Sequence, residues 1–336
     1  MKKKQLKHFV AKFVLACVLA VPAAGLTAPL TVPEKGLVLG AEEKQVYIGG
    51  MMGELFHPTS DEKLNKVLES YHFEVPDGWS LETMDLGGVS VERLKAQYPE
   101  SGRVILQLHG GGYTDGLVDS HRLLGAKQGI LAKAAAVYYV NYRLAPRYTY
   151  PAALEDAIAV YRGLIDSGTN AKNIIVIGDS AGGNLALELS LYLKKNGIAQ
   201  PGALILMSPW TTFETNGNSR RENKERDLVL GDKASPLYYE VKKPSYANGM
   251  KAKDPRLSPI YANMSGLPPM LVQVGGYELF LDDGLSLAKK SSVDGNKITM
   301  TVYPGMPHDF TLLLPDLNES ALSLQEFKEF VNRHMN

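Results

Sequence analysis

Cysteine is nearly absent from this 336-residue sequence, because its one cysteine is Cys17, near the N-terminus. From residue 29 onward the chain therefore offers no thiol for a disulfide or for a thiolate metal site. A net charge is missing too, since 36 basic residues balance 36 acidic ones. This balance does not favour nucleic acid as a partner. The fold must take its stability from a hydrophobic core, for which a hydrophobic content of 45% is ordinary.

The N-terminal segment combines a basic start with a short apolar stretch, which is typical of a signal peptide. The stretch Phe13–Ala24 is too short to span a bilayer comfortably. Small residues at Ala23 and Ala28 offer cleavage sites. We therefore expect a signal peptide over 1–28, a secreted protein and one mature domain over 29–336. The basic residues before the stretch are Lys2, Lys3, Lys4, Lys7 and Lys12.

Cys17 allows a second interpretation of this leader, namely a lipid anchor. The three residues before Cys17 are Val-Leu-Ala, which weakly resemble a lipobox. Lys12 interrupts the apolar run that a lipoprotein signal needs, so we favour a secreted protein over a lipoprotein. We expect no stable membrane span in the mature chain.

Short apolar runs alternate with amphipathic stretches along the rest of the chain. This alternation predicts an α/β fold with a mostly parallel sheet that is covered by helices on both faces. The expected strands are 89–94, 103–108, 135–142, 174–177, 203–207, 269–274 and 298–303. One expected helix begins near residue 60 and another follows residue 180. The other expected helices cover 151–164, 283–292 and 322–331.

Two segments do not follow the alternation. Residues 31–53 are rich in glycine and proline and lack a clear period, which indicates an irregular N-terminal arm. Residues 211–266 are polar and contain a dense charge run over 220–227, which indicates a solvated insertion. An insertion at this point would lie over the carboxyl edge of the sheet, where α/β active sites form.

A serine at a strand-to-helix turn is the strongest functional signal. The run Ile-Ile-Val-Ile at 174–177 meets Gly178, Ser180 and Gly182, and apolar residues then recur at helical spacing. The two glycines allow the strand and the helix to approach, and the turn exposes the serine hydroxyl at the helix N-terminus. This pattern predicts the nucleophile elbow of an α/β-hydrolase, with Ser180 as the nucleophile.

Three consecutive glycines follow the expected strand 103–108, in the run His109-Gly110-Gly111-Gly112-Tyr113. Glycines tolerate unusual backbone dihedrals and leave their N–H groups exposed, as an oxyanion hole requires. Upstream of an elbow, the run therefore favours an oxyanion loop over a plain flexible turn.

A serine nucleophile needs a histidine base and a carboxylate that orients the base. His308 is the histidine that follows a strand after Ser180, and it lies in a loop rich in glycine and proline. Glu278 lies just past the strand 269–274, whereas Asp282 is placed to cap the next helix. We favour Glu278 as the acid and keep Asp282 as the alternative.

These motifs resemble those of the hormone-sensitive-lipase-like branch of the α/β-hydrolases. The resemblance spans roughly residues 55–335 and implies a cap built from about 45–80 and 211–266. It also implies that Ser180 is the nucleophile, that His308 is the base, and that the N–H groups of Gly110, Gly111 and Ala181 form the oxyanion hole. Two departures stand out, since Glu278 replaces the usual aspartate and Arg147 replaces the usual acid. The matching stretches are 109–112, 142–146, 151–156, 178–183, 254–259 and 307–310.

We therefore predict a serine carboxylesterase that acts on small-molecule esters with short to medium acyl chains, without metal or cofactor. The same residues would suit an amidase or an exported polysaccharide deacetylase. A non-catalytic ligand-binding homologue is disfavoured because both Ser180 and His308 are present. Tyr113, Tyr138 and Trp210 are candidates for the wall of the substrate pocket or, equally, for the core.

Overall fold

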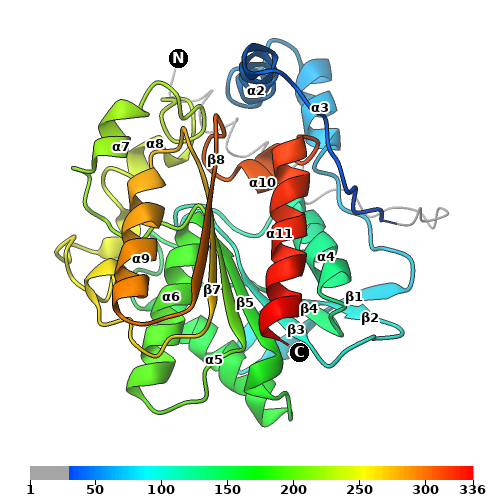
Figure 1. Ribbon diagram of the computed structural model, residues 1–336, viewed down its shortest axis with the longest axis vertical. Coiled ribbons are helices and arrows are strands. Elements are labelled where there is room, and N and C mark those ends of the chain that lie inside the picture. The colour runs from blue at the N-terminus through cyan, green and yellow to red at the C-terminus, as the bar shows by residue number, and fades with distance from the viewer. Residues whose placement is uncertain (1–29, 336) are drawn as a thin grey trace.

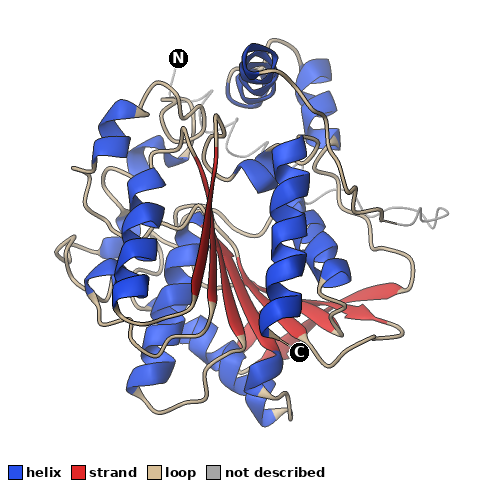
Figure 2. Cartoon of the chain, in the orientation of Figure 1, coloured by secondary structure: helices blue, strands red, loops and turns tan. Residues whose placement is uncertain are grey.

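A single eight-stranded sheet runs through the molecule, with helices on both faces (Figures 1 and 2). The computed structural model describes residues 30–335. The strand order is β1-β2-β4-β3-β5-β6-β7-β8, in which β2 is antiparallel to both of its neighbours, β1 and β4, and every other neighbouring pair is parallel. The expected mostly parallel sheet is confirmed, with one unpredicted strand, β1. The strands are β1 (Trp79–Leu86), β2 (Val89–Ala96), β3 (Val104–Leu108), β4 (Ala136–Val140), β5 (Ile174–Asp179), β6 (Ala203–Met207), β7 (Met270–Gly275) and β8 (Ile298–Tyr303).

Helices α4 and α11 pack on one face of the sheet, and α5, α6 and α9 pack on the other (Figure 1). The main helices are α2 (Ala41–Phe56), α3 (Asp61–Glu69), α4 (Asp119–Leu131), α5 (Ala152–Asp166), α6 (Ser180–Lys195), α9 (Leu281–Val293) and α11 (Asn318–His334). The short ones are α7 (Asn218–Glu222), α8 (Leu237–Glu240), α10 (Phe310–Leu313), η1 (Ala171–Asn173), η2 (Ser245–Ala247) and η3 (Pro259–Tyr261).

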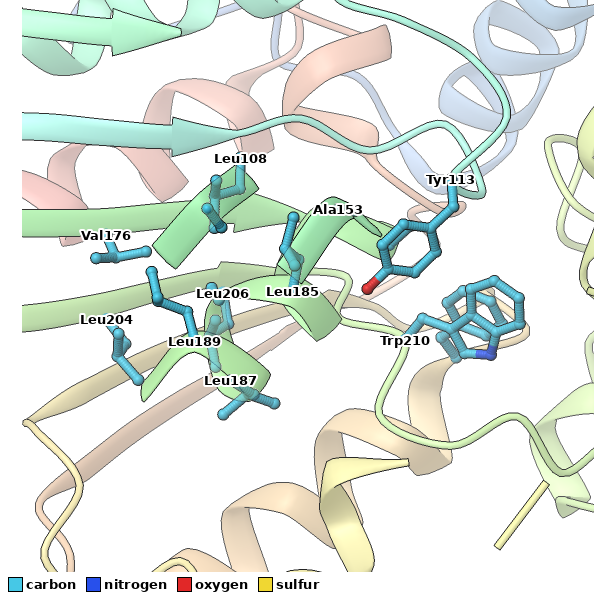
Figure 3. Packing of buried hydrophobic residues seen from close by; sticks show 14 of the residues in the cluster. Leu108, Tyr113, Ala153, Val176, Leu185, Leu187, Leu189, Leu204, Leu206 and Trp210 are labelled. Atoms are coloured by element: carbon cyan, nitrogen blue, oxygen red, sulfur yellow. The ribbon is translucent and has the colours of Figure 1, made fainter. Parts of the chain in front are cut away.

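Side chains alternate across the central strands and form two hydrophobic layers. In β5, Ile174 and Val176 join the layer under α6, while Ile175 and Ile177 join the layer under α4 and α11. This double burial explains why the strand is an unbroken apolar run, as is typical of parallel strands. Each fully buried aliphatic side chain contributes about 1.5–3 kcal/mol, so β5 and α6 form a rigid base for Ser180. Figure 3 shows the layer where Leu185 and Leu189 of α6 meet the strands.

The N-terminal arm contains a helix that the sequence did not reveal. Residues 31–53 were expected to be irregular, but α2 occupies Ala41–Phe56. Glu43 accepts a hydrogen bond from the N–H of Gly40 at 3.1 Å, which closes the first turn. Three glycines obscure the period of the helix, and a Cβ added at any of them would meet no other part of the fold within 4 Å. Tertiary contacts override this weak local preference.

Residues 211–266 are only partly solvated, which corrects the expectation for the charge run. Arg220 is buried against Asp283 of α9, with 3.1 Å between the guanidinium and the carboxylate. Asp227 is buried as well, and backbone N–H groups donate hydrogen bonds to both oxygens of its carboxylate. Arg226 is exposed, and the remaining charged residues of the run are at least half exposed in their side chains: Arg221, Glu222, Lys224 and Glu225.

The predicted signal peptide over 1–28 and the alternative lipid site at Cys17 lie outside the described residues, so both stay predictions. Between residues 30 and 335, no helix has the length and apolar character that crossing a bilayer requires.

Candidate active site

Ser180 lies at the sharp turn between β5 and α6, in a backbone conformation that serine rarely adopts. Its φ angle is +51°, in the left-handed region. A Cβ at Gly178 would lie 2.2 Å from the carbonyl oxygen of Gly182, and a Cβ at Gly182 would lie 1.9 Å from that of Leu108. Glycine is therefore required on both sides of Ser180, as the elbow pattern predicts.

His308 reaches Ser180 from the loop after β8. Its Nε2 lies 2.9 Å from the Ser180 Oγ, within hydrogen-bond distance. Both side chains are buried, and the edge of the His308 ring packs against Phe280. The structure thus brings together the serine and the histidine that the sequence singled out.

Glu278, from the loop after β7, lies on the opposite side of the His308 ring. Its Oε2 is 3.6 Å from Nδ1, which is an ion-pair distance and longer than a hydrogen bond. Asp282 is elsewhere, since its carboxylate accepts a hydrogen bond from the N–H of Ser219 at 3.0 Å. Of the two acids that the sequence offered, Glu278 is the one that contacts the base.

A third carboxylate, which sequence reasoning missed, lies beside the base. Asp309 Oδ2 is 3.1 Å from His308 Nε2, on the side that also faces Ser180. This contact depends on the left-handed conformation of Asp309, at φ +51° and ψ +36°. A sequence does not display that conformation, and adjacency to a histidine is a weak signal by itself.

The charges of this buried cluster depend on one another. Burial raises the pKa of Glu278 to about 7, although His308 opposes the rise. Burial also opposes a charge on His308, but Asp309 and Glu278 outweigh it and raise the pKa of the imidazole well above its usual value. The two carboxyl groups therefore stabilise the positive charge that the imidazole acquires when it takes up a proton.

Two further residues hold the loops that carry Glu278 and His308. Asp227 accepts hydrogen bonds at 2.7 Å from the N–H of Leu279 and at 3.5 Å from that of His308. Ser208, at the end of β6, accepts one at 3.1 Å from the N–H of Asp309. Neither residue stands out in the sequence, because Asp227 is part of a charge run and Ser208 follows an ordinary strand.

The glycine run after β3 has one donor that is already engaged. The N–H of Gly110, which we expected to be an oxyanion donor, donates to Asp179 Oδ2 at 3.0 Å in this structure. Asp179 remains charged in spite of its burial, because His121 and this N–H hold its pKa below the usual value. Gly111 and Gly112 have φ angles of +100° and +61°, and among the described residues nothing accepts a hydrogen bond from their N–H groups.

Two of the three aromatic candidates for the pocket wall, Tyr113 and Trp210, are buried among core residues. Tyr113 is fully buried, stacks on Tyr246 and donates to Asn184 Oδ1 at 2.7 Å. Trp210 is also fully buried and stacks on Phe213 and Phe280. Figure 3 shows Tyr113 and Trp210 near one end of the layer that packs on α6.

Ser180 is only 2% exposed, and segments far away in the sequence contact the loops around it. Gln45 of α2 donates to the carbonyl oxygen of Gly305 at 2.9 Å, in the loop that carries His308. Leu237 of α8 lies against the glycine run, 3.0 Å from where a Cβ of Gly112 would be. In the part of the chain that the structure describes, no group of three or more His, Cys, Asp or Glu side chains is arranged to hold a metal ion.

Comparisons with known proteins agree with this architecture. Residues 105–312 match the family described as alpha/beta hydrolase fold. The chain is 35% identical to an esterase of Acinetobacter venetianus over 73% of its own length and 79% of that protein. It is 34% identical to an acetyl-hydrolase of Streptomyces hygroscopicus, with 67% of this chain and 74% of that one covered. The solved structure of an esterase from the bacterial hormone-sensitive lipase family is 30% identical, with a TM-score of 0.77 over 89% of this chain and 100% of that one.

Proposed function

We propose that this chain, a carboxylic ester hydrolase that belongs to the hormone-sensitive-lipase-like branch of the α/β-hydrolase family, cleaves short- to medium-chain acyl esters through an acyl-enzyme. The contact of 2.9 Å between Ser180 Oγ and His308 Nε2 at a strained elbow carries this proposal. Such a pair is what a serine needs to become a nucleophile at neutral pH.

In the first step, Ser180 Oγ attacks the ester carbonyl while its proton moves to His308 Nε2. The tetrahedral intermediate then collapses, the bond to the alcohol breaks, and Nε2 gives its proton to the leaving oxygen. Water repeats the sequence on the acyl-enzyme, which releases the acid and restores the hydroxyl of Ser180. His308 Nε2 therefore takes up both the proton of Ser180 and the proton of the attacking water.

Glu278 is the acid of this triad in our proposal, and Asp282 is not. Its position beside Nδ1 supports the role, because a carboxylate there fixes the tautomer in which Nε2 is free to accept. The separation of 3.6 Å needs to shorten by somewhat less than 1 Å to give a hydrogen bond, and such contacts often tighten when substrate binds.

The N–H groups of Gly111, Gly112 and Ala181 are the oxyanion donors that we propose, in place of Gly110. The positive φ angles of Gly111 and Gly112 and the free state of their N–H groups support this choice. Ala181 is in the first turn of α6, where backbone N–H groups have no partner within the helix. A missing donor of this kind costs roughly 10²- to 10³-fold in kcat.

The elements above the site act as a cap in this proposal. The contacts of Gln45 with Gly305 and of Leu237 with Gly112 support it, since they hold α2 and the segment 211–266 over Ser180. A covered serine favours small substrates, because a long acyl chain needs an open groove. The relative from Streptomyces hygroscopicus is named an acetyl-hydrolase, which is in line with a preference for short acyl groups.

Hydrolysis of p-nitrophenyl esters from acetyl to palmitoyl tests the proposal. We expect turnover of the short esters, a loss of about 10⁴- to 10⁶-fold in Ser180→Ala, and a loss of about 10³- to 10⁴-fold in Glu278→Gln. Asp282→Asn, the matched control, should stay within about threefold of the wild type because an amide oxygen still accepts from Ser219. Retained activity in folded Ser180→Ala would contradict the mechanism, and a preference for palmitoyl would contradict the chain length.

A further inference from the structure

Two side chains, Ser180 and Asp309, contact the same nitrogen of His308. The proposed mechanism uses Ser180 but gives no role to Asp309. His308 Nε2 lies 2.9 Å from Ser180 Oγ and 3.1 Å from Asp309 Oδ2. A triad acid contacts the other ring nitrogen, so Asp309 is not a substitute for Glu278. A carboxylate on the side of the serine is instead placed to accept Nε2–H when the imidazole is protonated.

The backbone of Asp309 is fixed in the position that makes this contact. Its N–H donates to Ser208 Oγ at 3.1 Å, and its carbonyl oxygen accepts from Leu312 and Leu313 at 3.0 Å. The side chain is 8% exposed, and its Oδ1 has no hydrogen-bond partner among the described residues. A buried carboxylate that forgoes a partner for one oxygen is costly, which argues that its contact with His308 has a role.

We propose that Asp309 is a positioning residue that competes with Ser180 for His308 Nε2 and thereby sets the pH range in which His308 acts as a base. This inference rests on the proposed function of the triad. In the protonated state, Nε2–H donates to Asp309 and Nδ1–H faces Glu278, so the Ser180 hydroxyl has no acceptor. Loss of one proton to water frees the Nε2 lone pair, which then accepts from Ser180.

Other ionisable groups face His308 and Asp309, and some favour while others disfavour the charged forms of these two residues. Glu278 and Asp227 face His308 from the loop after β7 and from the segment 211–266, and both favour its charged form. Asp179 and His121 face Asp309 from β5 and α4, where Asp179 disfavours and His121 favours a charge on Asp309. Burial raises the pKa of Asp309 to about 6, so its carboxyl group is ionised at neutral pH.

The pH dependence of kcat/KM in Asp309→Asn tests the inference. Asparagine tolerates the left-handed conformation, keeps the size of the side chain and removes the charge. We expect the acid limb of the profile to move to lower pH by about one to three units, the range that a directly opposed charge produces. The plateau at alkaline pH should change by less than about fivefold, equal to about 1 kcal/mol. Asp282→Asn, which lies at the start of α9 away from His308, should leave the limb in place.

A titration of the His308 ring by NMR gives a second readout that does not need activity. The midpoint should move down in Asp309→Asn by the same amount as the kinetic limb. Asp309→Gly serves as the second variant if the asparagine form does not fold, because glycine suits a φ angle of +51°. An unmoved limb and an unmoved midpoint in a folded variant would overturn the inference. If the wild type hydrolyses no ester, the proposed function fails, and the NMR midpoint alone decides on Asp309.

Discussion

Gly182 packs directly against the carbonyl oxygen of Leu108, so closely that a Cβ at position 182 would lie 1.9 Å from that oxygen. Leu108 is the last residue of β3 and precedes the glycine run, while Gly182 is in the first turn of α6. This one contact therefore sets the distance between the nucleophile and the proposed oxyanion loop. Backbone atoms form both sides of it, so neither side can yield as a flexible side chain would.

Gly182→Ala should lower both activity and stability. The added methyl group forces α6 away from β3, and overpacking of this kind costs roughly 1–3 kcal/mol. A shift of about 1 Å between reacting groups lowers the rate by about 10²-fold. Urea unfolding and kcat/KM on a short ester measure the two effects. Gly50→Ala is the matched control, because Gly50 is inside α2 and an added Cβ would meet no other part of the fold within 4 Å, so this variant should gain about 0.5–1 kcal/mol. A variant at Gly182 with the activity of the wild type would show that the contact does not set the geometry.

The elbow could be predicted because local chemistry alone dictates it. A serine in a left-handed turn between a strand and a helix requires glycine on both sides, whatever the rest of the fold. His308 could be found by its position after Ser180 and after a strand. The structure was needed to choose between the two candidate acids. Glu278 and Asp282 are four residues apart, and only the fold decides which one reaches the imidazole.

The features that were missed depend on contacts between distant segments. Asp227 is buried because its partners are backbone N–H groups at Leu279 and His308, which no local pattern reveals. The N–H of Gly110 is engaged because Asp179 of β5 lies beside it. Helix α2 forms although its glycines weaken the local preference. In each case the deciding partner is far away in the sequence.

Asp227→Asn should loosen the loops that carry the triad. Asp227 uses one oxygen for the N–H groups of Val229 and Leu230 and the other for that of Leu279. An amide has one oxygen, so at least one buried N–H loses its acceptor, at about 1–3 kcal/mol. We expect kcat to fall more than KM rises, because the loss displaces the loop of Glu278.

Glu225→Gln is the matched control for this variant, since the side chain of Glu225 is 89% exposed and should tolerate the change. Thermal unfolding and steady-state kinetics on the two variants measure the difference. Equal stability and equal kcat in the two variants would contradict the assignment of Asp227 as the residue that holds these loops.

Glu188 is a buried acid without a hydrogen-bond partner for either carboxylate oxygen among the described residues. It is on α6, two turns beyond Ser180, and its charge would act on Tyr113 and Tyr246. Burial, assisted by Asp254, raises its pKa well above the usual value. The folded protein therefore binds a proton at Glu188 more tightly than the unfolded chain does.

This difference predicts that Glu188 makes the protein less stable as the pH rises above about 4.3, the value for an exposed glutamate. Above it, the folded state binds more protons than the unfolded state, so the free energy of unfolding falls with pH by up to about 1.4 kcal/mol per unit. Glu188→Gln removes the titrating group, so its stability relative to the wild type should increase between about pH 5 and about pH 8. Urea unfolding at both values measures the change, and Glu225→Gln should show none. If the difference between Glu188→Gln and the wild type were the same at both pH values, Glu188 would be ionised in the folded protein, and a counter-charge or water would have to reach it through the layer under α6.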